Sequence, residues 1–201
     1  MSSSIRSKVG KLFLPELLGL VFGLLVILCF WPGLSGDFLL DDAHSIQHNT
    51  ALHLESLDLA ALEQAAYSFV ANGGLRILPE LTFAFDYWRG GLDPAVFKST
   101  NLAIHVLTML ALSGFFRSLL GALGWSRRHA TLAAALMALA WAIHPLQASS
   151  VLYVVQRMQT LCTLFIVLAL WAWLRMRLVQ IEDGRSRTYG FVAVLCWLLA
   201  L

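Results

Sequence analysis

Long apolar runs and one long polar interval give this sequence its pattern. The first run covers residues 12–32, and its 21 residues would extend about 31 Å as an α-helix, enough to cross the hydrocarbon core of a bilayer. Further apolar runs predict helices at residues 95–120, 130–143, 161–174 and 189–201. The last of them has 13 residues and would extend only about 20 Å, which is too short to cross. We therefore expect residues 1–201 to be a single membrane domain, the N-terminal portion of a longer multipass protein.

The polar interval between the first two runs, residues 33–94, predicts a large loop with structure of its own. Within residues 54–70 the apolar side chains recur at helical spacing, as in an amphipathic helix that lies on a surface. The turn Asn72-Gly73-Gly74 is expected to end that helix. A shorter apolar and aromatic patch follows at residues 75–87, and Pro79 is expected to break it.

Composition supports a membrane protein. Hydrophobic residues make up 59% of the chain and charged residues 13%, against roughly half and a quarter in soluble proteins. The predicted fold class is all-α and integral to the membrane: a polytopic helix bundle with a large outer loop that contains an amphipathic helix. The net charge of +2 is too small to indicate a nucleic-acid partner. Because Cys29, Cys162 and Cys196 all lie in apolar runs, a disulfide framework is not expected.

The distribution of charge predicts an orientation. Residues 33–98 carry nine acids and three bases, whereas ten bases flank the ends of the apolar runs that the proposed topology places together on the other side. The positive-inside rule then places the N-terminus in the cytoplasm and the loop outside. The alternative for the first run is a cleaved signal peptide, because the small residues Gly33, Ser35 and Gly36 follow it.

The stretch with the most chemistry is residues 38–49, directly after the first predicted helix. Asp41 and Asp42 lie next to the imidazoles of His44 and His48. This combination suits a general base, a site for a divalent metal held by Asp42, His44 and His48, or both. One of the two aspartates is expected to be reactive and the other to brace the loop or cap a helix, in either order.

Other polar side chains are predicted at the same outer interface. They are Asn101 and His105 in the second helix, His144 after the third, and Gln156 and Arg157 before the fourth. Polar groups in membrane helices are costly, so we expect them to bind substrate or phosphate, or else to bond neighbouring helices. Arg157 and Arg76 are assigned to phosphate, with interfacial anchoring as the alternative. Arg89 and Lys98 are expected to be solvated or to face head groups.

These groups together indicate an amphiphilic substrate. A lipid-linked phosphate could keep its tail in the bilayer and its head group beside the aspartates and arginines. Transfer of a sugar from such a carrier needs a base for the acceptor hydroxyl and cations for the departing phosphate. No Gly-rich phosphate loop is visible in the sequence, which disfavours a nucleotide-sugar donor.

The order of these motifs resembles the N-terminal membrane half of bacterial GT-C type glycosyltransferases, and among them the transmembrane and tetratricopeptide-repeat O-mannosyltransferases. The similar segments are FLLDD at 38–42, Arg76, LTFAFDY at 81–87, GGLDP at 90–94, NLAIH at 101–105, HPLQ at 144–147 and YVVQR at 153–157. Two positions depart from the family pattern, which commonly has Asn where this chain has Asp86 and an acid where it has Ser149.

The resemblance implies a hexosyltransferase that, as part of a full-length protein, moves a sugar from a polyprenyl-phosphate carrier to a hydroxyl on a protein or glycan acceptor. The transfer would occur outside the cytoplasm, with inversion, and would use an acidic residue of the first outer loop, which in this chain is Asp41 or Asp42. The expected location is the bacterial inner membrane. The alternative is a non-catalytic membrane scaffold or subunit, a truncated or degenerate relative.

Overall fold

The computed structural model describes residues 2–69, 76–183 and 187–200, and every regular element within those ranges is a helix. Among these described residues, three segments are long and apolar enough to cross a membrane: Leu14–Gly33, Pro94–Ala122 and Val154–Ile181. The prediction of an all-α membrane protein is therefore confirmed.

The chain forms two compact units, and each is described separately below. The helical unit comprises Met1–Cys29, His105–His144 and Thr163–Leu201, and the loop unit comprises Phe30–Ile104 and Pro145–Cys162. Two long helices, α4 (Pro94–Ala122) and α7 (Arg157–Asp183), contribute residues to both units.

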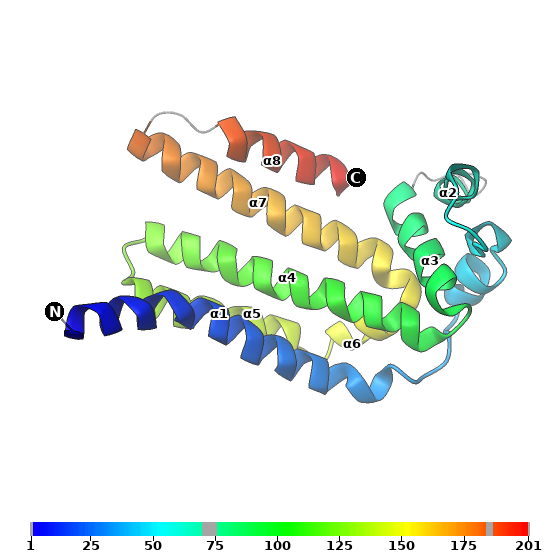
Figure 1. The fold of residues 1–201 in the computed structure, drawn as a ribbon, viewed down its shortest axis with the longest axis horizontal. Helices are drawn as coiled ribbons and strands as arrows, with labels where there is room; N and C mark the ends of the chain where they lie inside the picture. Colours follow the sequence, from blue (N-terminus) through cyan, green and yellow to red (C-terminus); the bar gives the residue numbers. More distant parts are fainter. Residues whose placement is uncertain (1, 70–75, 184–186, 201) are drawn as a thin grey trace. The chain divides into compact units, whose positions relative to one another are not determined.

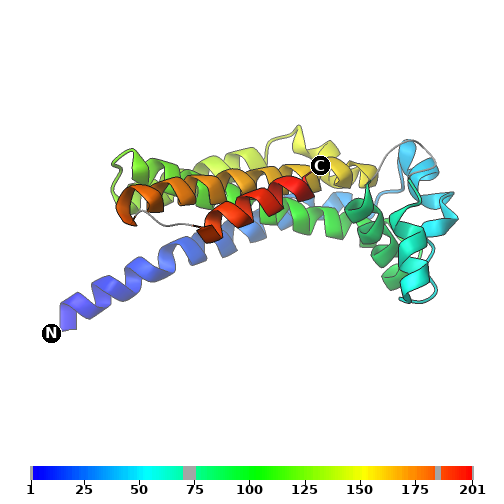
Figure 2. The same ribbon diagram turned by 90° about the horizontal axis from the view of Figure 1, so that it is seen from above.

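The helical unit packs its helices through small residues. It contains most of α1 (Ser2–Phe30), α5 (Arg127–Ala142) and α8 (Arg187–Leu199), with the C-terminal parts of α4 and α7. Gly114 of α4 faces the indole ring of Trp171 of α7, whose Nε1 donates a hydrogen bond to Ser118 at 3.0 Å. Small residues let helix backbones approach closely in membrane bundles. Figures 1 and 2 show α8 returning beside α7.

The helices agree with the sequence expectations in position but not always in length. Helices α4 and α5 coincide closely with the runs at 95–120 and 130–143. Helix α7 is much longer than the expected 161–174, because arginines at its C-terminal end continue the helix as good helix formers. Helix α5 begins where Ser126 caps it by accepting the His129 N–H at 3.4 Å.

The loop unit is built from short helices. They are η1 (Trp31–Gly33), η2 (Ala43–Gln47, a π-helix), η3 (Thr50–Leu52), α2 (Leu59–Ala66), α3 (Ile77–Gly90), α6 (Gln147–Leu152) and η5 (Val154–Gln156). Figure 2 shows α2 beside α3. Their shared core consists of buried apolar residues: Ile46, Leu52, Leu54, Ala65, Phe83, Ala84, Phe97 and Val154.

Two expectations for the loop are corrected. The amphipathic helix predicted over 54–70 is only α2, because Asp58 caps it by accepting the Ala61 N–H at 2.9 Å; Val70 and the turn at 72–74 lie outside the described residues. Pro79 does not break the patch at 75–87 but lies in the first turn of α3. Proline is tolerated there because the first amide groups of a helix have no intrahelical partner.

Candidate functional site

The two aspartates lie on a tight turn at the start of the loop unit. The Asp42 N–H donates to the carbonyl of Leu39 at 2.8 Å, and the Leu39 N–H donates back to Asp42 Oδ2 at 2.9 Å. Between them, Leu40 adopts a left-handed backbone with φ of +40° and is 86% exposed. Such a conformation is rare for a residue with a side chain and recurs at functional sites. The turn presents the Asp41 side chain to solvent.

Asp42 braces the turn from inside. Its side chain is fully buried and accepts backbone hydrogen bonds from Val155 at 2.7 Å and Val154 at 3.4 Å, in addition to the Leu39 bond. Burial raises the pKa of Asp42, although these amides and the nearby Lys98 act in the opposite direction. Of the two orders that the sequence left open, this geometry gives the bracing role to Asp42 and leaves Asp41 exposed.

Tyr153 connects Asp41 to the same distant segment. The Asp41 N–H donates to the Tyr153 hydroxyl oxygen at 3.0 Å. Desolvation and the neighbouring Asp41 carboxylate raise the pKa of Tyr153, so its hydroxyl keeps its proton at neutral pH and can act as a donor. The exposed aspartate therefore lies beside a protonated phenol.

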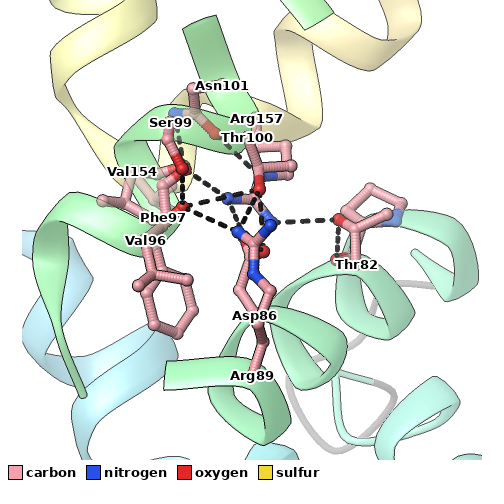
Figure 3. Close-up of polar contacts among 12 residues, drawn as sticks. Thr82, Asp86, Arg89, Val96, Phe97, Ser99, Thr100, Asn101, Val154 and Arg157 are labelled. Carbon is pink, nitrogen blue, oxygen red and sulfur yellow. Dashed lines mark hydrogen bonds and ion pairs between the residues drawn. The ribbon is translucent and has the colours of Figure 1, made fainter. Parts of the chain in front are cut away.

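Arg157 is the centre of a buried polar cluster (Figure 3). Its guanidinium lies 2.6 Å from Asp86 Oδ2, and it donates to Asn101 Oδ1 at 2.7 Å, to the Phe97 carbonyl at 2.7 Å and to Thr82 Oγ1 at 3.3 Å. The ring of Phe83 lies 4.5 Å from the guanidinium carbon. Each guanidinium nitrogen thus has a protein partner, and the side chain has no exposed surface.

Arg157 and Asn101 act on the backbone that holds Asp42. Asn101 Nδ2 lies 3.3 Å from the carbonyls of both Tyr153 and Val154, while its Oδ1 accepts from Arg157. These contacts fix the segment whose amides bind Asp42. Phosphate contacts predicted for Arg157 and Asn101 are not supported by this geometry, because their hydrogen-bonding groups are engaged inside the protein.

Sequence reasoning missed Asp86 and misjudged Lys98. Asp86 is buried and also accepts from Thr100 Oγ1 at 2.7 Å and Arg89 at 3.0 Å, so Arg89 is not simply a solvated charge. The available signal was a lone acid inside an aromatic run with a base three residues later. Lys98 is 2% exposed and donates to the carbonyls of Gly36 at 2.6 Å and Asp37 at 3.0 Å. It anchors the start of the loop and does not face head groups.

The remaining predicted site residues are divided between the units. In the loop unit, Arg76 is exposed, stacks on Phe69 at 4.5 Å and contacts the sulfur of Met158, and Gln156 is half-buried in η5. In the helical unit, His105 is buried and its Nε2 lies 2.9 Å from the Ala142 carbonyl, a bond between α4 and α5. His144, in the same unit, is exposed.

The described part of the chain contains no group of three or more His, Cys, Asp or Glu side chains placed to hold a metal ion. We therefore do not propose the metal site predicted from Asp42, His44 and His48. The physical reason is that the Asp42 carboxylate is buried against backbone amides, while His44 and His48 are exposed.

The candidate membrane spans and the loop unit define the class of protein: a polytopic α-helical membrane protein with a buried ionic cluster. The chain is 30% identical to the human protein O-mannosyl-transferase TMTC4 over 198 residues, which cover 88% of this chain and 27% of that protein. It is 32% identical to the mouse protein O-mannosyl-transferase TMTC4 over 162 residues, covering 75% of this chain and 22% of that protein. The predicted resemblance to O-mannosyltransferases is thus confirmed.

The match covers only part of each relative. The chain spans only about a quarter of the length of the curated relatives that it matches. No protein-family model matches the chain. No solved structure matches it either. Because the relatives are human and mouse proteins, they do not support the expected bacterial inner membrane.

Proposed function

We propose that this chain is part of a membrane glycosyltransferase that moves a sugar, mannose in the first instance, from a polyprenyl-phosphate carrier to a protein hydroxyl. The observation that carries the proposal is the difference between the two aspartates of the Leu39–Asp42 turn. Asp42 is locked by three backbone amides, and the adjacent Asp41 is left exposed beside the Tyr153 hydroxyl. The names of the two curated relatives support the sugar and the acceptor class.

The chemistry follows from an exposed carboxylate. Asp41 accepts the proton of the acceptor hydroxyl while the hydroxyl oxygen attacks the anomeric carbon of the sugar. The bond from that carbon to the carrier oxygen breaks, and the carrier phosphate leaves with the electron pair. Attack opposite to the leaving group inverts the anomeric centre. Arg76, an exposed guanidinium of the loop unit, is the proposed contact for the departing phosphate.

The surroundings of the turn suit a donor with a lipid tail. Leu39, Leu40 and Trp31 expose large apolar side chains in the loop unit, and the first candidate span ends at Gly33. Tryptophan favours the boundary between lipid and water. The positive-inside rule, applied to the distribution of basic residues in the sequence, supports placing the turn on the non-cytoplasmic face.

The test compares single variants of the full-length protein. Asp41→Asn should lower transfer from polyprenyl-phosphate mannose to a serine- or threonine-containing peptide by about 100-fold or more, because general-base catalysis contributes that much. It should leave the melting temperature near that of the wild type. Asp42→Asn should lower both activity and melting temperature. Glu55→Gln, at an exposed acid of the same loop, is the matched control and should change neither.

Full activity in a folded Asp41→Asn variant would refute Asp41 as the base. A folded full-length protein that transfers no sugar from any polyprenyl-phosphate donor would favour the non-catalytic scaffold.

A further inference from the structure

The helical unit contains a basic pocket that the transferase proposal does not use. It has a volume of about 430 Å³ and lies among the C-terminal end of α4, the N-terminal end of α5 and α7. Three arginines line it, Arg117 from α4, Arg127 from α5 and Arg175 from α7. Ser118 and Trp125 also line it.

The lining of this pocket is basic, although Arg117 also lines a neighbouring cavity together with Glu16. No aspartate or glutamate is among the described residues that line it, and the ion pairs found in the described ranges join Asp86 to Arg89 and Arg157, in the loop unit. Arg175 instead has the ring of Tyr189 at 5.7 Å. Three guanidinium groups around one cavity repel one another, and an anion bound among them would relieve that repulsion.

The pocket lies at a membrane boundary. The candidate spans of α4 and α7 end at Ala122 and Ile181, close in sequence to the lining residues. Leu123 and Trp125 expose their side chains in the connection between α4 and α5, as expected of residues at head-group level. The α5 N-terminus adds backbone amide groups, which favour phosphate.

We propose that this pocket binds the phosphate group of an anionic phospholipid. Guanidinium groups bind phosphate oxygens through paired hydrogen bonds, and basic pockets between membrane helices are typical head-group sites. The site is independent of the Asp41 turn and of the transferase chemistry. The same chemistry would accept free phosphate, so the experiment separates the two sources.

The probe is phosphatidylglycerol, supplied as a minor component of phosphatidylcholine nanodiscs that contain the full-length protein. Retained lipid is measured by native mass spectrometry after mild detergent release. Arg117→Gln, Arg127→Gln and Arg175→Gln should each lower retention of phosphatidylglycerol by about five-fold, the usual effect of one arginine at an anionic surface. Retention of phosphatidylcholine should not change.

The matched control is the triple variant Arg128→Gln, Arg177→Gln and Arg187→Gln, which removes three charges from arginines that do not line the pocket. It should retain phosphatidylglycerol like the wild type, whereas the triple pocket variant should lose it. An equal loss in both triple variants, or a loss in neither, would overturn the proposal. So would tight binding of inorganic phosphate in pure phosphatidylcholine nanodiscs together with no preference for phosphatidylglycerol. Melting temperatures and monodisperse elution check folding, and the single variants keep the test decisive if the triple variant does not fold.

Discussion

Arg157 Nη2 lies 2.6 Å from Asp86 Oδ2, and both side chains are excluded from solvent. The pair joins the start of α7 to α3, and through Asn101 it reaches the backbone that binds Asp42. A buried pair of this kind gains little net energy over apolar residues, but losing one partner leaves an uncompensated charge. Its main effect here is to fix the position of the Tyr153–Val155 backbone.

The first prediction concerns this pair. Arg157→Leu should lower the free energy of unfolding by about 3–5 kcal/mol, because it leaves the buried Asp86 with the half-exposed Arg89 as its charged partner and the Thr100 hydroxyl as a neutral one. The free energy of unfolding of Arg157→Lys should lie between those of the wild type and Arg157→Leu, since an ammonium group keeps the charge but cannot reproduce the forked contacts. Thermal unfolding in detergent measures both. Arg89→Gln is the control and should cost far less; an equal cost would contradict the central role of Arg157.

The second prediction is a pH dependence caused by Glu80. Burial raises the pKa of Glu80 from 4.5 to about 7, while Ser68 donates to Oε2 at 2.9 Å and Oε1 has no hydrogen-bond partner among the described residues. Between these two values the folded protein holds a proton that the unfolded chain releases. Stability should therefore fall as pH rises from 4.5 to about 7, by up to about 1.4 kcal/mol per pH unit from this group.

Glu80→Gln tests this dependence because the amide keeps an acceptor for Ser68 and does not titrate. The difference in melting temperature between the variant and the wild type should grow in favour of the variant as pH rises through that range. Asp42, whose pKa is also raised, contributes in the same direction in both proteins and cancels in the difference. Glu63→Gln, at an exposed position of α2, should leave the pH profile unchanged.

The third prediction concerns Tyr153 and depends on the proposed transferase function. Tyr153→Phe removes the hydroxyl that accepts the Asp41 N–H and lies beside the Asp41 carboxylate. A typical hydrogen bond contributes about 1 kcal/mol net, so kcat should fall about five-fold. KM should stay near the wild-type value, and the melting temperature should fall no further than the loss of this one hydrogen bond explains. The exposed Tyr67, changed to Phe, serves as the comparison. A lower melting temperature with unchanged kcat would show that Tyr153 only holds the fold.

The fourth prediction compares two glycines of α4. A Cβ at Gly114 would overlap the indole ring of Trp171, whereas a Cβ at Gly121 would meet no atom within 4 Å. Gly114→Ala should therefore cost about 1–3 kcal/mol through overpacking. Gly121→Ala should be neutral or stabilise by up to about 1 kcal/mol, as alanine favours helices. Equal melting temperatures for the two variants would show that α4 and α7 do not pack in this way.

Hydropathy predicted the membrane helices because a bilayer imposes one length and one polarity on each span. The first apolar run and the run at 95–120 needed no tertiary information. Charged residues carry no comparable length rule, so the extension of α7 through Arg175 and Arg177 was missed. In the loop, one polar cap at Asp58 decided where α2 begins, and periodicity alone could not locate it.

The candidate site was predictable in its residue types but not in its roles. Asp41 and Asp42 are adjacent and chemically identical, and their contacts in the folded chain, above all the bonds from the amides of Val154 and Val155 to Asp42, distinguish them. Lys98 and Arg157 look like surface bases in the sequence, yet both are buried because carbonyl or carboxylate oxygens from distant segments surround them. Pairings of this kind depend on tertiary contacts that one sequence does not encode locally.

The brace on Asp42 also determines the order in which the protein can be assembled. Its amide partners, Val154 and Val155, follow it by 112 and 113 residues, so the ribosome makes them only after the helix at 95–120 and the next one have been synthesised. Until then the newly made carboxylate has only water and the local Leu39 amide to bind. The Leu39–Asp42 turn therefore reaches its final structure only after a segment more than a hundred residues further along the chain has been translated.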